Sequence, residues 1–197
     1  MRFHPTKLAV AWAAIAILIC LFSSGIVRAE GQSRDNVRLK EKKLGTTKPV
    51  HAFGDIYLTG QPAAEDLGAL SSAGVKTVIS LRHTKELPWN EAKSVEMNGM
   101  RFIHAPFSGA DQLKSEVFEK VLNDLRNERL RPVVLHCAVA NRVGAIWYAY
   151  RVLDGGLLPE EALKEAQTVG LRTPAYLQRA QEYVEAAQRE RSATQTP

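Results

Sequence analysis

The stretch Pro132–Trp147, whose sequence is PVVLHCAVANRVGAIW, decides the fold of this chain. An apolar run typical of a buried strand leads directly to Cys137, and a six-residue loop from Cys137 to Arg142 follows it. The apolar residues after Arg142 have the length and composition of a buried helix. The stretch therefore predicts a strand, a tight loop and a helix, with one thiol and one guanidinium close to the helix N-terminus.

Strands and helices alternate along the chain around this stretch. Strands are predicted at 56–58, 76–81, 101–106 and 132–137, and helices at 62–72, 89–98, 114–127, 143–153 and 159–170, with one more helix after them. Such alternation predicts an α/β fold in three layers, with a mainly parallel sheet and helices on both of its faces. In such a sheet ligands bind beyond the carboxyl ends of the strands, which is where Cys137 is placed.

The chemistry of this position suits a small anion. The first N–H groups of a helix have no intrahelical acceptor, and the helix dipole adds a partial positive charge. The same surroundings favour thiolate over thiol. The planar fork of Arg142 can hold two oxygens of a tetrahedral oxyanion at once. Taken alone, Cys137 is a nucleophile or a small buried side chain at a strand end; together with Arg142 and the helix, it is interpreted as a nucleophile.

Three motifs occur in order along the chain. They are LTGQP at 58–62, GVKTVISLR at 74–82 and HCAVANRVGA at 136–145. Over about Phe53 to Trp147 they resemble the bacterial beta-lactamase-hydrolase-like phosphatase family of the tyrosine and dual-specificity phosphatase superfamily. The resemblance implies a cysteine phosphatase-like fold, in which Cys137 forms a phosphocysteine and Arg142 holds the phosphoryl oxygens. It also implies that His136 orients the loop and favours the thiolate.

The loop departs from the superfamily pattern in two ways. Most members have five residues between Cys and Arg, whereas this chain has four, which are Ala138, Val139, Ala140 and Asn141. These four are expected to bind substrate with His136, and Asn141 is the one that readily tolerates a positive φ. Val143 stands where the superfamily usually has Ser or Thr. The hydroxyl that would assist hydrolysis of the intermediate is therefore missing, and slow turnover is expected.

The remaining site residues follow two other predicted strand ends. The resemblance implies a general acid on the loop after the preceding strand, where Asp111 in SGADQ (108–112) is the best-placed acid. The alternative for Asp111 is a capping role for the helix that follows. Arg82 and Glu86 follow another strand, and they either line the substrate pocket or pair with each other.

Two other functions remain open from the sequence. Rhodanese-like sulfurtransferases also use a six-residue loop from Cys to Arg, which would make Cys137 the carrier of a persulfide. The Asp-Val-Arg and Gly-His-Ile-Pro patterns that usually precede a rhodanese loop are missing from the sequence, so sulfur transfer ranks second. The third possibility is a non-catalytic phosphate-binding module, which Val143 and the short loop make credible.

The sequence contains no sign of a metal or other cofactor. Its five His, at positions 4, 51, 83, 104 and 136, lack the Cys or carboxylate spacing of a metal site. Catalysis without metal or cofactor is expected, with a phosphorylated protein or small molecule as substrate. Nucleic-acid binding is not supported, because the chain has no aromatic and basic surface pattern.

The N-terminus reads as an export signal. Residues 1–29 combine early basic residues, the apolar run Leu8–Phe22 and small residues for cleavage around Ala29. Without its three basic residues the net charge falls from +5 to +2. We expect a periplasmic or secreted protein with no stable membrane insertion after cleavage; an uncleaved anchor is the alternative.

The rest of the chain divides into three predicted parts. These are a basic flexible linker at 30–50, the catalytic domain at 51–190 and a polar tail at 191–197.

Overall fold

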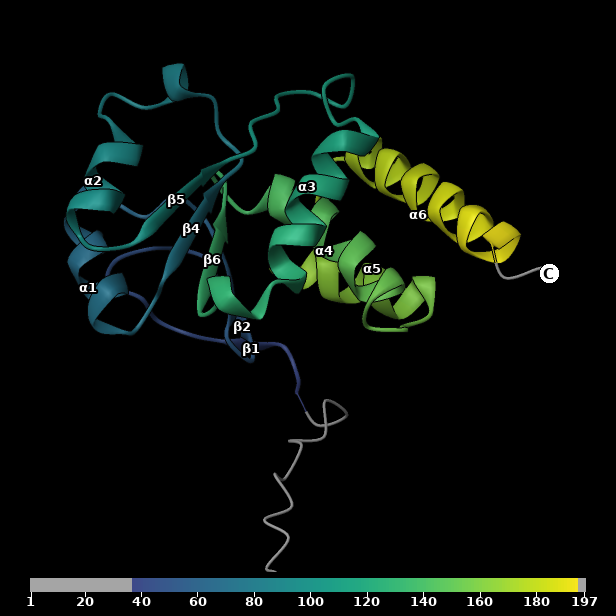
Figure 1. The fold of residues 1–197 in the computed structure, drawn as a ribbon, viewed down its shortest axis with the longest axis horizontal. Helices are drawn as coiled ribbons and strands as arrows, with labels where there is room; N and C mark the ends of the chain where they lie inside the picture. The colour runs from purple at the N-terminus through teal and green to yellow at the C-terminus, as the bar shows by residue number, and fades with distance from the viewer. Residues whose placement is uncertain (1–36, 195–197) are drawn as a thin grey trace, which may run out of the picture. The chain divides into compact units, whose positions relative to one another are not determined.

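The fold is built on a six-stranded sheet (Figure 1), seen in a computed structural model that describes residues 37–194. The strand order is β1-β2-β3-β6-β4-β5. β3, β6, β4 and β5 run parallel, while β1 and β2 add an antiparallel edge. The strands are β1 Lys40–Glu41, β2 Val50–Phe53, β3 Ile56–Thr59, β4 Thr77–Ser80, β5 Arg101–His104 and β6 Val133–His136. The predicted α/β class with a mainly parallel sheet is confirmed.

Helices cover both faces of the sheet, which gives the three predicted layers. α1 Leu67–Ser72 and α2 Glu91–Met97 pack on one face through a core that includes Leu70, Val95 and Val134. A larger core, with Phe118, Leu135 and Trp147, lies between the sheet and the other helices. These are α3 Ser115–Arg126, α4 Asn141–Leu153, α5 Pro159–Val169 and α6 Pro174–Thr194; three short 3-10 turns are η2 Ala64–Asp66, η3 Thr84–Glu86 and η4 Glu128–Leu130.

The strand and helix on either side of the loop are the most enclosed parts of the domain. All four residues of β6 are buried, because β6 lies between β3 and β4 and carries a core on each face. α4 is buried over most of its length, as its nearly continuous apolar composition predicts. The loop between them is therefore anchored at both ends in close-packed structure, which fixes its position.

The predicted linker up to residue 50 is wrong for residues 37–50. β1 pairs with β2, and Leu44 is buried. The carboxylate of Asp66 accepts hydrogen bonds from the hydroxyls of Thr46 and Thr47 at 2.9 and 3.0 Å. This segment is held by the pairing of β1 with β2 and by the carboxylate of the distant Asp66. Neither contact requires an apolar periodicity, so neither leaves a local sign in the sequence.

The ends of the predicted domain also differ from the structure. α6 continues through Thr194, so the first residues of the predicted tail are helical. The predicted signal peptide and the alternative membrane anchor lie outside the described residues. Among residues 37–194, no helix has the length and apolarity needed to cross a membrane.

Candidate active site

The loop that follows β6 starts where three parallel strands end together. Thr59 at the end of β3 and Ser80 at the end of β4 are both in register with His136, the last residue of β6. The next residue is Cys137, which is 1% exposed. The candidate nucleophile therefore lies beyond the carboxyl ends of the central strands, the edge at which parallel α/β sheets bind their ligands.

The loop turns through a left-handed residue. Ala140 has a φ of 61° and is the N-cap of α4, so the positive φ falls on Ala140 and not on Asn141, the loop residue that tolerates it most readily. A non-glycine residue in this region costs about 1–2 kcal/mol, and the small Ala side chain keeps the crowding to a minimum. The strained residue stands directly between the nucleophile and the helix, where such strain is typical of functional loops.

The backbone on either side of the loop holds it in place. Gly60 forms a bridge with Val139, and the N–H of Gln61 donates to the carbonyl of Ala138 at 3.1 Å. The side chain of Val139 is 52% exposed, so it lies on the surface of the loop. This pairing explains why the segment 58–62 and the loop occur together as motifs: one is the structural support of the other.

Asn141 supports the loop from the opposite side. Its amide group donates to the hydroxyl of Thr173 at 2.8 Å, and its side-chain oxygen accepts from the N–H of Arg172 at 2.8 Å. The side chain of Asn141 is thus committed to the connection between α5 and α6. What this residue retains for an anion is its backbone N–H, in the first turn of α4, where helical N–H groups have no intrahelical acceptor.

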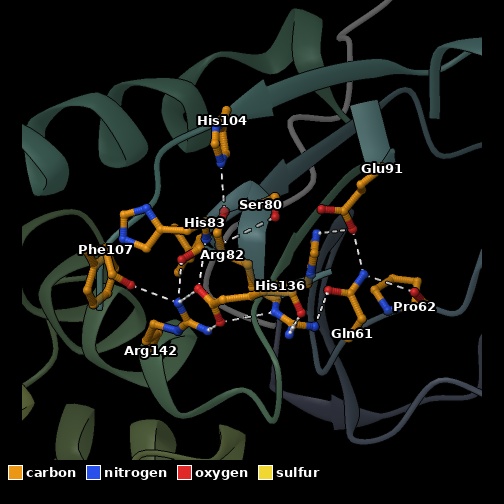
Figure 2. A network of polar contacts seen from close by, with 12 residues as sticks. Gln61, Pro62, Ser80, Arg82, His83, Glu91, His104, Phe107, His136 and Arg142 are labelled. Carbon is orange, nitrogen blue, oxygen red and sulfur yellow. Dashed lines mark hydrogen bonds and ion pairs between the residues drawn. The ribbon is translucent and has the colours of Figure 1, made fainter. Parts of the chain in front are cut away.

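Arg142 reaches back across the strand ends (Figure 2). One terminal nitrogen donates to the carbonyls of Leu81 and Phe107, both at 2.8 Å, and to Glu86 at 2.9 Å, while the other donates to Glu86 at 2.7 Å. Burial disfavours the charge, but the bonds to Glu86 and the nearby Cys137 outweigh it and raise the pKa of Arg142. Arg142 is therefore close enough to Cys137 for the sulfur to contribute to its raised pKa.

Glu86 joins the two arginines of the site. Its hydrogen bonds with Arg142 outweigh burial and lower the pKa of Glu86 from 4.5 to about 2. Arg82 also contacts Glu86, through Nε at 3.3 Å and a second bond at 2.7 Å to the Glu86 carbonyl. Of the two roles considered for Arg82 and Glu86, the structure shows the pairing, and it adds that the pair fixes Arg142.

Gln61, Glu91 and His136 form a second polar cluster, which the sequence did not reveal as a unit. The amide of Gln61 donates to Glu91, and its oxygen accepts from Arg82 at 3.0 Å. Glu91 Oε1 lies 3.1 Å from Nε2 of His136. In the sequence Glu91 is an ordinary first-turn acid of a short helix, and only the packing of α2 against the strand ends makes it a buried neighbour of the loop.

Asp111 stands apart from these contacts. It lies in an exposed turn before α3, and within the described residues its side chain makes no hydrogen bond or ion pair that the structure defines. The N-cap of α3 is Lys114, so the alternative capping role of Asp111 does not hold. The neighbouring Gln112 anchors this turn by accepting from Ser108 at 2.9 Å and by lying 3.0 Å from Nε2 of His83.

The arrangement as a whole can bind the oxygens of a phosphoryl group and attack its phosphorus. It places a sulfur, a fixed guanidinium and the N–H groups of a helix start around one loop, and a phosphoryl group carries oxygens for each donor. Among the side chains of residues 37–194, no group of three or more His, Cys, Asp or Glu is placed to hold a metal ion.

The fold is that of tyrosine and dual-specificity-like phosphatases. TpbA from P. aeruginosa is 26% identical, with a TM-score of 0.56 over 70% of this chain and 83% of TpbA. A TpbA variant in complex with pTyr is 23% identical, with a TM-score of 0.60 over 77% and 90%. The PP-IP phosphatase SIW14 from S. cerevisiae, in complex with citrate, is 19% identical, with a TM-score of 0.59 over 72% and 88%. No family model and no curated protein sequence matches this chain.

Proposed function

We propose that this protein is an exported cysteine-dependent phosphatase that hydrolyses a phosphate monoester. The observation that carries the proposal is the short loop from Cys137, directly after β6, to Arg142 in the first turn of α4, with the guanidinium held by Glu86. The fold of the phosphatases named above supports the same reaction. The complex of a TpbA variant with pTyr makes a phosphotyrosine side chain the first substrate to test.

The reaction begins with attack of the Cys137 sulfur on phosphorus. A P–S bond forms while the P–O bond of the ester breaks, and the alcohol or phenol leaves with a proton supplied by a general acid, for which Asp111 is proposed. Arg142 and the loop N–H groups hold the phosphoryl oxygens throughout. Water then attacks phosphorus, the P–S bond breaks, inorganic phosphate departs, and the proton of the water returns to Asp111.

Turnover is expected to be slow. Val143 is fully buried and carries no hydroxyl at the position from which the superfamily usually assists departure of the thiolate. Hydrolysis of the phosphocysteine is therefore the step we expect to limit the rate, and a burst of phenol before steady state would reveal it.

The test is hydrolysis of an aryl phosphate by the full-length protein. We expect phosphate release that is lost in Cys137→Ser and reduced by at least about a hundredfold in Arg142→Ala, which can no longer hold the phosphoryl oxygens.

Thiosulfate and cyanide are the substrates of the alternative assay, for sulfur transfer, because the six-residue loop also suits a persulfide. Production of sulfite and thiocyanate without phosphate release would replace the phosphatase by a sulfurtransferase. Tight phosphate binding with neither product would indicate a binding module.

Export is a separate part of the proposal. It rests on the apolar run at 8–22 and the small residues before residue 30. N-terminal sequencing of the protein recovered from the periplasm or medium is expected to start near Glu30. An intact N-terminus in the membrane fraction would instead establish the anchored form.

A further inference from the structure

The steps of the proposed reaction use neither Gln61 nor Glu91, although both lie in one cluster with His136. His136 is fully buried and Glu91 is 6% exposed, so the imidazole and the carboxylate are enclosed together beneath the loop. Their atoms Nε2 and Oε1 are 3.1 Å apart, a close but bent contact that lacks the direction of a straight hydrogen bond. Figure 2 shows Glu91 and His136 facing one another, with Gln61 drawn below them.

Such a carboxylate needs a reason to be charged in the interior. Burial opposes ionisation, but the His136 ring beside the carboxylate and the hydrogen bond from Gln61 outweigh it and hold the pKa of Glu91 below its usual range. An unpaired carboxylate would be strongly disfavoured in the interior. Glu91 is therefore a fixed negative charge, and it faces the ring of the residue that immediately precedes the nucleophile.

The nitrogens of His136 define what this charge does. Among the described residues neither ring nitrogen of His136 has a hydrogen bond of standard geometry, and the Glu91 carboxylate, 3.1 Å from Nε2, is the charged group beside the ring. A carboxylate favours a proton on the nitrogen that faces it, as second-shell carboxylates do for other functional histidines. Glu91 thereby fixes the proton on Nε2 and, with it, the orientation of the ring beside Cys137.

The cluster also connects the two ends of the loop. Gln61 donates to Glu91 and accepts from Arg82, and Arg82 donates to Glu86, which holds Arg142. One polar chain thus runs from His136, before the nucleophile, to Arg142, at the end of the loop (Figure 2).

We propose that Glu91 is a positioning residue for the reaction: it fixes His136 and, through Gln61 and Arg82, ties the nucleophile end of the loop to the guanidinium end. This inference rests on the proposed phosphatase function. Its specific consequence is that removal of the carboxylate disturbs the positions of the reacting groups in both steps, and so lowers kcat, more than it disturbs binding of the phosphate, because Glu91 acts through His136 and Gln61.

The test compares Glu91→Gln and Glu91→Ala with a matched control in the full-length protein. Asp66→Asn is the control, because Asp66 is also a buried carboxylate whose pKa is lowered by hydrogen bonds, but its partners Thr46 and Thr47 lie in the N-terminal segment. For an aryl phosphate we expect kcat to fall about tenfold in Glu91→Gln and further in Glu91→Ala, with KM within about twofold, as misplacement of reacting groups does. Asp66→Asn should lower the midpoint of urea unfolding and leave kcat unchanged.

Imidazole ¹⁵N spectra supply a readout that a purely structural role would not move. In the wild type the His136 signals should be those of a ring protonated at Nε2, and Glu91→Ala should lose this form while the signals of His51 and His104 stay. If Glu91→Ala does not fold, Glu91→Gln decides. Unchanged kcat and unchanged His136 signals in Glu91→Gln, with only a lower unfolding midpoint, would overturn the proposal.

Failure of the proposed function would be recognised separately. If the wild type releases no phosphate, the rate of Cys137 alkylation by iodoacetate replaces kcat. Alkylation slowed by about tenfold in Glu91→Gln, but not in Asp66→Asn, would still support the positioning role. Equal rates in all three proteins would exclude it.

Discussion

Arg142 and Glu86 form a forked ion pair, with the two terminal nitrogens of the guanidinium 2.9 and 2.7 Å from the two carboxylate oxygens. Together with the carbonyls of Leu81 and Phe107, Glu86 holds the guanidinium in one position, close enough for the Cys137 sulfur to contribute to its raised pKa. Preorganisation of this kind lets a guanidinium stabilise a developing charge at little reorganisation cost.

Replacing this carboxylate should therefore cost catalysis. In Glu86→Gln one arm of the fork is lost, and we expect kcat for an aryl phosphate to fall about tenfold because the arginine samples other positions. Glu165→Gln is the matched control: Arg151 and Glu165 are 2.8 Å apart and have almost the same exposure as Arg142 and Glu86. Similar losses in both variants would show that only general stability was affected.

The same carboxylate should control part of the acid stability. The pKa of Glu86 is about 2 in the folded protein against 4.5 ordinarily, so the folded state binds its proton less readily than the unfolded state. The resulting stabilisation is complete above pH 4.5 and is lost as the pH falls towards 2. After allowance for solvent screening it amounts to about 2 kcal/mol. Urea unfolding of wild type and Glu86→Gln between pH 2 and pH 7 measures it; parallel curves would contradict this assignment.

Asp111→Asn tests the proposed acid. A general acid matters most when the leaving group is a poor one, so alkyl phosphates should slow by about a hundredfold while activated aryl phosphates barely change. Asp124→Asn, on the far part of α3 and paired with Lys120, is the control. Equal loss on good and poor leaving groups would remove Asp111 from this role.

Gly60→Ala tests the support beneath the loop. A Cβ at Gly60 would overlap the carbonyl of Lys48 and lie close to that of Ala138, so we expect about 1–3 kcal/mol of destabilisation together with loss of activity. Gly68→Ala is the control, because its Cβ would meet nothing nearer than 3.8 Å and helix α1 should gain about 0.5–1 kcal/mol. Unchanged activity and unfolding midpoint in Gly60→Ala would show that the bridge to Val139 does not support the site.

Much of the fold follows from local pattern. The continuous apolar residues of β6 and α4, and the alternation of strands and helices around them, were sufficient to predict the parallel sheet and the place of Cys137. The turn of the loop did not follow from residue type: Asn141 tolerates a positive φ most readily, but its side chain is held by Arg172 and Thr173, and Ala140 takes the positive φ. The prediction of a flexible linker was wrong for residues 37–50, because the carboxylate that binds Thr46 and Thr47 belongs to Asp66, about twenty positions away.

The pattern of residues is enough to show that a thiol and a guanidinium flank a tight loop between a buried strand and a buried helix, since periodicity and spacing are local properties of the chain. Which carboxylates contact the residues of this loop depends on the tertiary fold. Glu86 and Glu91 reach Arg142 and His136 because parallel strands end at one edge of the sheet, and this proximity depends on strand order and register, which leave no trace in the spacing of residues.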